Sequence, residues 1–228
     1  MSHDLRTPLN SILGFLGILS TDTTRNLAAE RFQEYGQNIH IAADSLLTLV
    51  NDLLDLSRIE AGQFPIHPEE FVLGPLVEET ANSSAPVSKP ETSGSTVRLR
   101  DVTVASDRRA ISQILSNLLS NGLKYTDPAG HVSVTLVAAT ATDRAQIIVS
   151  DTGRGIPPDD LLLIFEPYFR GSADIARDIS GTGLGLPICK RPAELIDADL
   201  QIDSEVSVGT SVSLSLPPDI PPQADAAR

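Results

Sequence analysis

The stretch DRRAISQILSNLLSNGLKYT, residues 107–126, has the spacing of an amphipathic helix. Asn117, Asn121 and Lys124 are four and three positions apart, so they share one helical face. Two amides and an ammonium group on one face suit a metal–phosphate cluster, because amide oxygens ligate Mg²⁺ and lysine binds phosphate; a solvated surface is the alternative. The apolar residues that lie mainly on the other face are Ile111, Ile114, Leu115 and Leu118.

Runs that alternate apolar and polar residues surround this helix, and a period of two is typical of half-buried strands. Several of these runs could be joined as hairpins, which favours an α+β two-layer sandwich over a doubly wound parallel sheet. Residues 81–95 are rich in proline and serine and are expected to form a loop. The predicted strands lie in TVRLRDVTV (96–104), HVSVTLVAA (131–139), AQIIVSD (145–151), LQIDS (200–204) and TSVSLSLP (210–217).

Residues 5 to about 62 show a helical period instead. Apolar residues from Leu5 to Leu19 and from Ile39 to Leu56 alternate in steps of three and four, as in a coiled coil or four-helix bundle. A second row widens the stripe, so we expect a second copy of the chain to complete an antiparallel four-helix bundle. Packing of the hairpin onto the rest of the same chain is the alternative. The second row is Ala43, Leu47, Val50 and Leu54.

Three units are therefore expected: a helical hairpin over residues 1–65, a sandwich domain over 66–217 and a disordered tail over 218–228. The chain has 17 Lys and Arg against 30 Asp and Glu, a formal charge of −13, which disfavours nucleic-acid binding. Cys189 is the single cysteine, so we expect no internal disulfide and a cytoplasmic location. No apolar run is long enough for a membrane span, so we expect no membrane contact within the chain, and any membrane-bound sensor would lie upstream.

Two glycine-containing motifs suggest a nucleotide site. In IIVSDTGRGIP a predicted strand leads directly into Asp151, whose carboxylate could accept a hydrogen bond from an adenine amino group. In GTGLGL, residues 181–186, three glycines precede a predicted helix whose N-terminal N–H groups would face phosphate. Between them, Phe165 and Phe169 could anchor a mobile lid over a nucleotide. Taken singly, a plain turn or an ordinary surface loop would explain each motif.

Together, the asparagine-bearing helix, the DTGRG turn, the phenylalanine anchor and GTGLG resemble the ATPase domain of histidine kinases, in the same order. The resemblance implies the Bergerat ATP-binding sandwich shared with gyrase, Hsp90 and MutL-type ATPases. The hairpin that begins with SHDLRTPLN, residues 2–10, similarly resembles the dimerisation and phosphoacceptor domain of histidine kinases. Nearly the whole chain is covered by these two resemblances.

The resemblance implies roles for the residues of SHDLRTPLN. His3 would be the phosphoacceptor, since a neutral imidazole is a competent nucleophile near pH 7. Asp4 would accept the proton from the other ring nitrogen. Thr7 would orient a water molecule when the partner is dephosphorylated, and Pro8 would kink the helix near the reactive site.

The resemblance also implies an ATP and Mg²⁺ site. Asn121, and less directly Asn117, would ligate Mg²⁺, while Lys124 would contact phosphate and Tyr125 would lie near the ribose or the lid. Asp151 would bind adenine. The remaining residues implied to form the ATP site are Gly153, Gly155, Phe165, Phe169, Arg170, Gly181, Thr182, Gly183, Leu184, Gly185 and Thr210.

Some features depart from the family pattern. The chain begins two residues before His3, whereas the family's first helix starts a few turns earlier, so a frayed helix end and a weakened dimer are expected. Pro187 falls near a helix start, where proline is tolerated. Pro192 lies inside the next predicted helix, which we expect to break there or to lose about 3 kcal/mol. IDAD, residues 196–199, lacks the glycine that usually ends this helix.

These observations favour an ATP-dependent protein-histidine kinase that passes its phosphoryl group to an aspartate of a separate response regulator, which it could also dephosphorylate. Water-activating relatives carry a glutamate where this chain has Asn117, and an amide cannot act as that base. An ATPase or chaperone of the same fold is therefore disfavoured. An inactive pseudokinase or phosphotransfer adaptor, which would dock receiver domains through the helical bundle, remains the main alternative.

Overall fold

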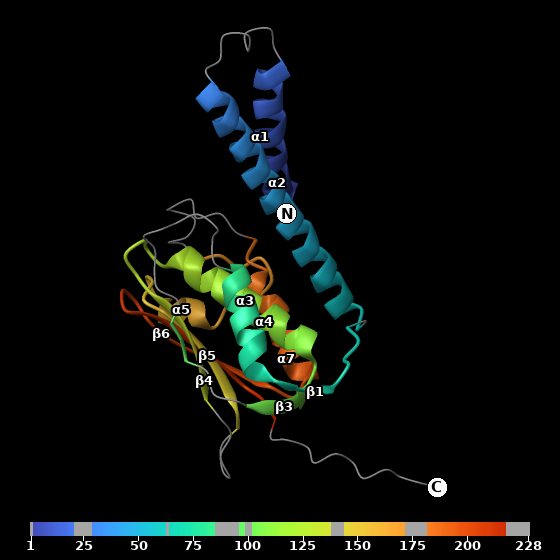
Figure 1. Cartoon of the computed structure of the whole chain (residues 1–228), viewed down its shortest axis with the longest axis vertical. Coiled ribbons are helices and arrows are strands. Elements are labelled where there is room, and N and C mark those ends of the chain that lie inside the picture. Colours follow the sequence, from blue (N-terminus) through green and yellow to red (C-terminus); the bar gives the residue numbers. More distant parts are fainter. Residues whose placement is uncertain are drawn as a thin grey trace.

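The structure is a computed structural model of the chain, and it describes residues 2–20, 29–62, 64–84, 96–98, 102–137, 144–171 and 182–217. Figure 1 shows two parts, a long helical hairpin and a sandwich of helices on a sheet that lies against the second half of the hairpin's longer helix. Within the described ranges, no helix combines the length and hydropathy that a bilayer crossing needs. The predicted tail over 218–228 lies outside the described residues.

The hairpin consists of α1 (Ser2–Ser20) and α2 (Ala29–Glu60), as the heptad spacing predicts. The two helices pack side by side, and the rings of Phe15 and Tyr35 meet with their centroids 5.6 Å apart. Pro8 lies inside α1, where its ring removes one intrahelical hydrogen bond. Most of the predicted turn at residues 20–26 lies outside the described residues.

The apolar rows of the hairpin have unequal environments. Ala42 and Leu56 on one face of α2 are buried, and Leu46, Leu49 and Leu53 of the same row are half-buried. The second row remains exposed, with Leu47 at 60% of its full accessibility. A broad apolar face of this hairpin is therefore left uncovered within one chain. Other exposed large apolar residues of the hairpin are Leu9, Leu13, Leu16, Val50 and Leu54.

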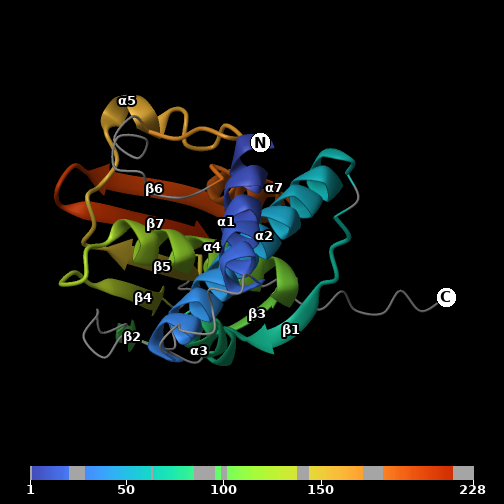
Figure 2. The same ribbon diagram turned by 90° about the horizontal axis from the view of Figure 1, so that it is seen from above.

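The sandwich contains a five-stranded sheet in the order β2-β4-β5-β7-β6, best followed in Figure 2. Neighbouring strands are antiparallel except β2 and β4, which confirms the α+β class. A second, two-stranded sheet pairs β1 (Glu69–Val72) with β3 (Thr103–Ser106). The five strands are β2 (Thr96–Arg98), β4 (Val132–Val137), β5 (Gln146–Asp151), β6 (Asp199–Glu205) and β7 (Gly209–Ser215).

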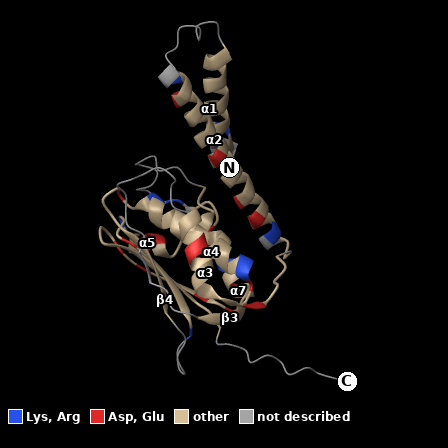
Figure 3. Ribbon diagram, viewed as in Figure 1, with Lys and Arg blue, Asp and Glu red and all other residues tan. Residues whose placement is uncertain are grey.

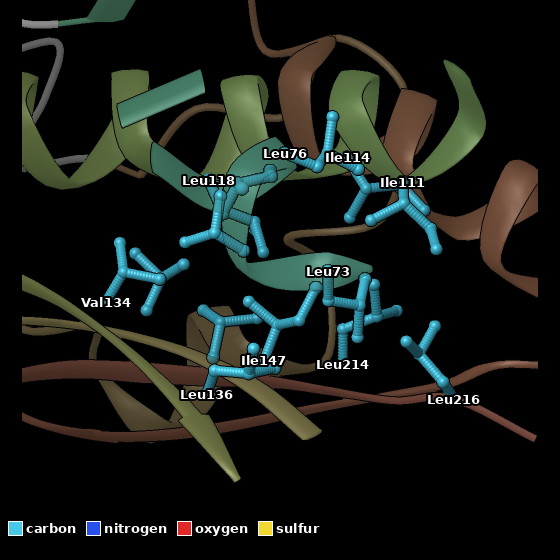
Figure 4. Close-up of a cluster of buried hydrophobic side chains, with 14 of the residues drawn as sticks. Leu73, Leu76, Ile111, Ile114, Leu118, Val134, Leu136, Ile147, Leu214 and Leu216 are labelled. Carbon is cyan, nitrogen blue, oxygen red and sulfur yellow. The ribbon is translucent and has the colours of Figure 1, made fainter. Parts of the chain in front are cut away.

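Helices α3 (Leu73–Ser84), α4 (Arg108–Tyr125) and α7 (Gly185–Leu195) cover one face of this sheet. Figure 4 shows how leucine and isoleucine side chains of α3 and α4 point down onto Val134, Leu136 and Ile147 of the sheet. Ile114 of α4 and Val134 of β4 have no exposed surface at all. Burial of such side chains contributes roughly 1.5–3 kcal/mol each, and it fixes α4 against the sheet.

Asp107 sets the start of α4. Its Oδ1 accepts hydrogen bonds from the backbone N–H groups of Arg109 and Ala110, at 2.9 and 3.0 Å, which makes it the N-cap residue. Its Oδ2 accepts another from the N–H of His67, at 2.6 Å. Burial alone would raise the pKa of this carboxyl, but the backbone donors and Arg109 together lower it. The ionised cap ties the chain before β1 to the helix of the site.

Two sequence predictions need correction. The run 96–104 was expected to form one strand, but β2 and β3 belong to different sheets, because β2 pairs with β4 while β3 pairs with β1. The loop expected over 81–95 begins later, since residues 81–84 complete α3. That helix was not predicted, although the spacing of Leu73, Leu76, Val77 and Ala81 carries its buried face. The rest of the loop, residues 85–95, lies outside the described residues.

Helix α7 continues through Pro192 to Leu195, so of the two expected outcomes, a break or an energetic cost, the break does not occur. The proline lies in the last turn and is itself buried, so its ring packs in the core while only one backbone bond is lost. Asp197 then adopts a left-handed conformation, with φ of 56°. The N–H of Ala198 donates to the carbonyl of Ala193 and that of Asp197 to Glu194, at 2.9 and 3.2 Å, a Schellman cap without its usual glycine.

Candidate nucleotide site

A cavity of about 1240 Å³ lies between the hairpin and the sandwich. On the sandwich side it is lined by the end of α4, the end of β5 and the start of α7, and on the hairpin side by α1 and α2. The described residues of the three sequence motifs thus meet around one space. Predicted site residues among its lining are Thr7, Asn117, Asn121, Lys124, Tyr125, Asp151, Gly155, Phe169, Arg170, Thr182, Gly183, Gly185 and Thr210.

Asp151 is the last residue of β5 and lies at the inner end of this space. Its Oδ1 accepts hydrogen bonds from the backbone N–H groups of Gly153, at 2.8 Å, and Thr210, at 3.3 Å. Burial raises the pKa of this carboxyl, and these two donors oppose the rise. A half-buried carboxylate is a strong acceptor for an amino group, and it needs such a partner to offset its desolvation.

Two glycines allow the backbone to approach closely. Gly155 has φ of 68°, and a side chain there would collide with the carbonyl of Glu205. Gly183 also has φ of 68°, and a β-carbon there would lie 2.6 Å from the carbonyl oxygen of Phe169. The carbonyl of Gly183 accepts a hydrogen bond from the N–H of Tyr168, at 3.0 Å. The phenylalanine segment and the GTGLG segment are therefore held side by side.

Several positively charged side chains gather at the C-terminal end of α4. Lys124 Nζ lies 3.0 Å from the Tyr125 hydroxyl, and the guanidinium of Arg154 lies 4.6 Å from the Tyr125 ring centroid. Burial, followed by the positive charges of Arg170 and Arg154, lowers the pKa of Lys124 to about 8. Figure 3 shows the blue segments at this end of α4, within an otherwise acidic chain. Polyanionic phosphates would relieve this repulsion.

Arg154 was not identified by sequence reasoning. It lies between the two glycines of DTGRG, so its position in the motif was visible, but only folding places it over Tyr125 from the α4 motif. Its carbonyl accepts a hydrogen bond from the N–H of Ser207, at 2.7 Å, which fixes the turn. We therefore add Arg154 to the lining of the site.

The two predicted metal ligands have different surroundings. The amide of Asn121 lies against Gly185, where a β-carbon would be 3.4 Å from its Nδ2, so it faces the start of α7. The side chain of Asn117 instead hydrogen-bonds Cys189, whose thiol is fully buried and has its pKa raised to about 12 by that burial. Cys189 is thus a small core residue, as expected of a buried cysteine.

The remaining predicted residues surround the cavity or lie beside it. Phe165 is outside the lining, and Lys190 Nζ lies 5.8 Å from its ring centroid. Leu184 is buried below the glycines, and Gly153 is enclosed by Tyr125 and Asp151. Gly181 and the polar stretch that follows the phenylalanine anchor, where a lid was predicted, lie outside the described residues. His3 and Asp4 occupy the first turn of α1, and their side chains also lie outside the described part.

These residues fit ATP in size and chemistry, with the Asp151 carboxylate as an acceptor, a glycine-lined backbone and a cluster of cationic side chains. Among the described residues, no group of three or more His, Cys, Asp or Glu side chains could hold a metal by itself. Asn117 and Asn121 line the cavity, and their amide oxygens are of a kind that can ligate Mg²⁺ together with substrate phosphates.

Comparison with known families agrees with this geometry. Residues 106–220 match the family of histidine kinase-, DNA gyrase B- and HSP90-like ATPases, and residues 1–62 match the His Kinase A (phospho-acceptor) domain. The chain belongs to this ATPase family, and the two domains joined in this order form the transmitter module of sensor histidine kinases. Dimerisation and pairing with response regulators are general properties of such modules.

Individual relatives extend over nearly the whole chain. Histidine protein kinase DivJ of Caulobacter vibrioides is 38% identical over 225 residues, which are 95% of this chain and 36% of that protein. The autoinducer 2 sensor kinase/phosphatase LuxQ of Vibrio cholerae is 35% identical over 100% of this chain and 27% of its own length. This chain thus spans well under half the length of these curated relatives.

Solved structures show the same fold. The crystal structure of full-length ShkA in complex with AMPPNP is 29% identical, with a TM-score of 0.67, and covers 95% of this chain and 44% of that one. The Acinetobacter baumannii histidine kinase AdeS has the same TM-score at 24% identity, covering 94% of this chain and 98% of that one, and shares the fold.

Proposed function

We propose that this chain is an ATP-dependent protein-histidine kinase that phosphorylates His3 and passes the phosphoryl group to an aspartate of a separate response regulator. The observation that carries the proposal is the single cavity that joins the Asp151 and Lys124 site to Thr7 of the phosphoacceptor helix. An adaptor without nucleotide chemistry would have no use for a cationic site opposite that helix.

In this proposal ATP is the substrate, and its adenine amino group donates to Asp151. Lys124, Arg154 and Arg170 bind the phosphates, and the N–H groups at the start of α7 face them. Asn121 holds Mg²⁺, which supplies charge neutralisation of the phosphates when bound. The other predicted ATP-site residues, including Thr182, Thr210 and the glycines, shape this pocket, with Asn117 supporting it through Cys189.

The transfer is a displacement at the γ-phosphorus. A ring nitrogen of His3 attacks, the bond from phosphorus to the bridging oxygen breaks, and ADP leaves with that electron pair. Asp4 takes the proton from the other ring nitrogen, and Thr7 positions water when the response regulator is dephosphorylated. Because Asn117 cannot act as a general base, direct attack by water at the same phosphorus remains slow.

The module has three parts in this proposal: the phosphoacceptor hairpin over 1–65, the ATP-binding domain over 66–217 and a disordered tail over 218–228. The exposed row of Leu47, Val50 and Leu54 forms the interface of a homodimeric four-helix bundle. We place the module in the cytoplasm, where ATP and the reducing conditions suited to a lone buried thiol are found.

Incubation with γ-labelled Mg-ATP tests the proposal. We expect wild-type protein to acquire a label that is labile in acid and stable in base, as a phosphohistidine is. His3→Gln should abolish the label without changing ATP affinity, and Asn121→Ala should abolish both. His40→Gln is the matched control, because His40 lies exposed on α2 beside Asp44, and it should label normally. ATP binding that is absent from wild-type protein would contradict the kinase and leave the adaptor.

A further inference from the structure

The cavity between the hairpin and the sandwich is lined on both sides by elements of this chain. Helix α1 contributes Thr7 and Ser11, and α2 contributes a row that ends at Asp52. The nucleotide residues of the sandwich form the opposite wall. The phosphoacceptor helix of this chain and its proposed ATP site therefore face each other across the cavity.

Three contacts hold the sandwich against its own α2. The hydroxyl of Thr182, in the GTGLG segment, donates to Asp52 Oδ2 at 3.2 Å. The amide of Gln113 on α4 hydrogen-bonds Asp55 Oδ2, and Leu56 packs with Leu184 and Ile188 of the sandwich. The glycine segment that would bind phosphate is thus attached directly to the helix that pairs with α1.

The register of the hairpin places position 3 near this attachment. Phe15 lies opposite Tyr35, and an antiparallel pair keeps the sum of its residue numbers constant, so position 3 lies level with Leu47. Asp52 is five residues further along α2, or about 7.5 Å along the helix axis at 1.5 Å per residue. Thr7, one turn after His3, already lines the cavity. Measured along the helix axis only, the level of position 3 and the level of Asp52, which holds the glycine segment, differ by about one to two helical turns.

A partner's helix would lie on the other side. At about 100° per residue, Leu47, Val50 and Leu54 point roughly 140–200° away from the cavity residue Ser45. On α1, the exposed Leu9, Leu13 and Leu16 point away from the cavity residue Ser11 by similar angles. A second copy that covers these rows packs against the face opposite the cavity, so its own α1 is farther from this nucleotide than the chain's own α1.

We propose that each chain phosphorylates its own His3, because the nucleotide site and the phosphoacceptor helix that face each other across the cavity belong to the same chain. This inference rests on the proposed kinase function and adds which subunit supplies the acceptor. The transfer is the displacement written above, with the γ-phosphoryl moving from ATP to a His3 ring nitrogen of the same chain and ADP leaving.

Mixed dimers decide between the two routes. We would co-express two differently tagged chains, purify the mixed dimer through both tags and incubate it with γ-labelled Mg-ATP. The first pair combines His3→Gln with Asn121→Ala, so one chain lacks the acceptor and the other lacks the metal ligand. Phosphorylation within a chain predicts no label above that of the His3→Gln homodimer. Label on the Asn121→Ala chain would overturn the inference.

The second pair is the reciprocal test. It combines wild-type chain with a chain that carries both substitutions, and the inference predicts label on the wild-type chain. An unlabelled wild-type chain in this pair would overturn the inference even if both variants fold poorly in the first pair. The wild-type homodimer distinguishes failure of the kinase function from failure of the same-chain route. If the wild-type homodimer acquires no label, the kinase function itself is contradicted. If it is labelled, but the first mixed dimer is labelled and the second is not, only the same-chain route is contradicted.

Discussion

Leu118 of the sandwich and Leu47 of the hairpin both belong to the apolar row of an amphipathic helix, yet Leu118 is 3% exposed and Leu47 is 60% exposed. The helices of the sandwich pack on the sheet and on one another, and the buried residues of α4 belong to one core with both. The hairpin is built from two helices, and within the described part of the chain its second row stays exposed. The sandwich therefore completes its core alone, while the hairpin leaves a surface that suits a second copy.

The largest effect on stability should come from a substitution in the buried core of the sandwich. Ile114→Ala removes a side chain with no exposed surface between α4 and the rest of the core, and we expect it to lower the free energy of unfolding by about 2–5 kcal/mol. Urea unfolding followed by circular dichroism measures this. A loss no larger than that of an exposed leucine would show that the sandwich is not the independent unit described above.

The exposed row of the hairpin should matter for assembly instead. Leu47→Ala occurs twice in a dimer and should weaken dimerisation by about 2 kcal/mol or more, because each copy loses buried apolar surface. Sedimentation equilibrium would measure the dissociation constant. Leu162→Ala is the matched control, since Leu162 is 84% exposed on the sandwich and should leave the dimer unchanged. Equal effects of the two substitutions would remove the distinction between the regions.

Asp151→Asn should separate binding from stability within the sandwich. The neutral amide loses a charge-assisted hydrogen bond to adenine, so ATP affinity should fall about tenfold or more by calorimetry. Because burial raises the pKa of Asp151, its ionised form weakens the fold as pH rises through that pKa. The variant should therefore unfold no more easily than wild type at pH 7. A marked loss of stability would mean that the carboxylate supports the fold rather than the ligand.

The pH dependence of ATP affinity tests whether Lys124 binds phosphate in its protonated form. Lys124 has a pKa of about 8 in the free protein, and bound phosphate favours its protonated form. ATP affinity should fall as pH rises above 8, by at most about tenfold per pH unit. Lys124→Arg should flatten this dependence, because arginine stays protonated. Without ligand, the free energy of unfolding should rise as pH increases from about 8 toward the ordinary lysine pKa. In that range Lys124 is protonated in the unfolded chain and has lost its proton in the folded one.

The smallest expected effect comes from a substitution at the C-terminal cap of α7, away from the nucleotide site and the exposed row of the hairpin. Asp197→Gly places glycine at the left-handed cap of α7 and should raise the free energy of unfolding by about 0.5–1 kcal/mol. Asp197→Ala retains the strain and serves as control. A destabilised glycine variant would indicate that the aspartate side chain contributes more to the cap than its backbone strain removes.

The sequence predicts the parts of this molecule whose signals are local. Helix α4, with Asn121 and Lys124 on one face, and strand β5 ending in Asp151 follow from spacing alone, and the heptads predict α1 and α2. What it could not predict depends on contacts between distant residues. Thr182 and Asp52 are 130 positions apart, and Arg154 reaches Tyr125 only after the sheet has formed. The split of β2 from β3 likewise depends on which partner strand each one meets.

The most direct test of the account is to locate the phosphoryl group. After incubation with Mg-ATP at neutral pH, digestion under alkaline conditions and mass spectrometry should place one phosphoryl group on the peptide that contains His3. We expect this peptide alone to carry the phosphoryl group, and His3→Gln to remove it. A phosphoryl group on another residue, or ADP release with no phosphorylated peptide, would contradict phosphorylation of His3.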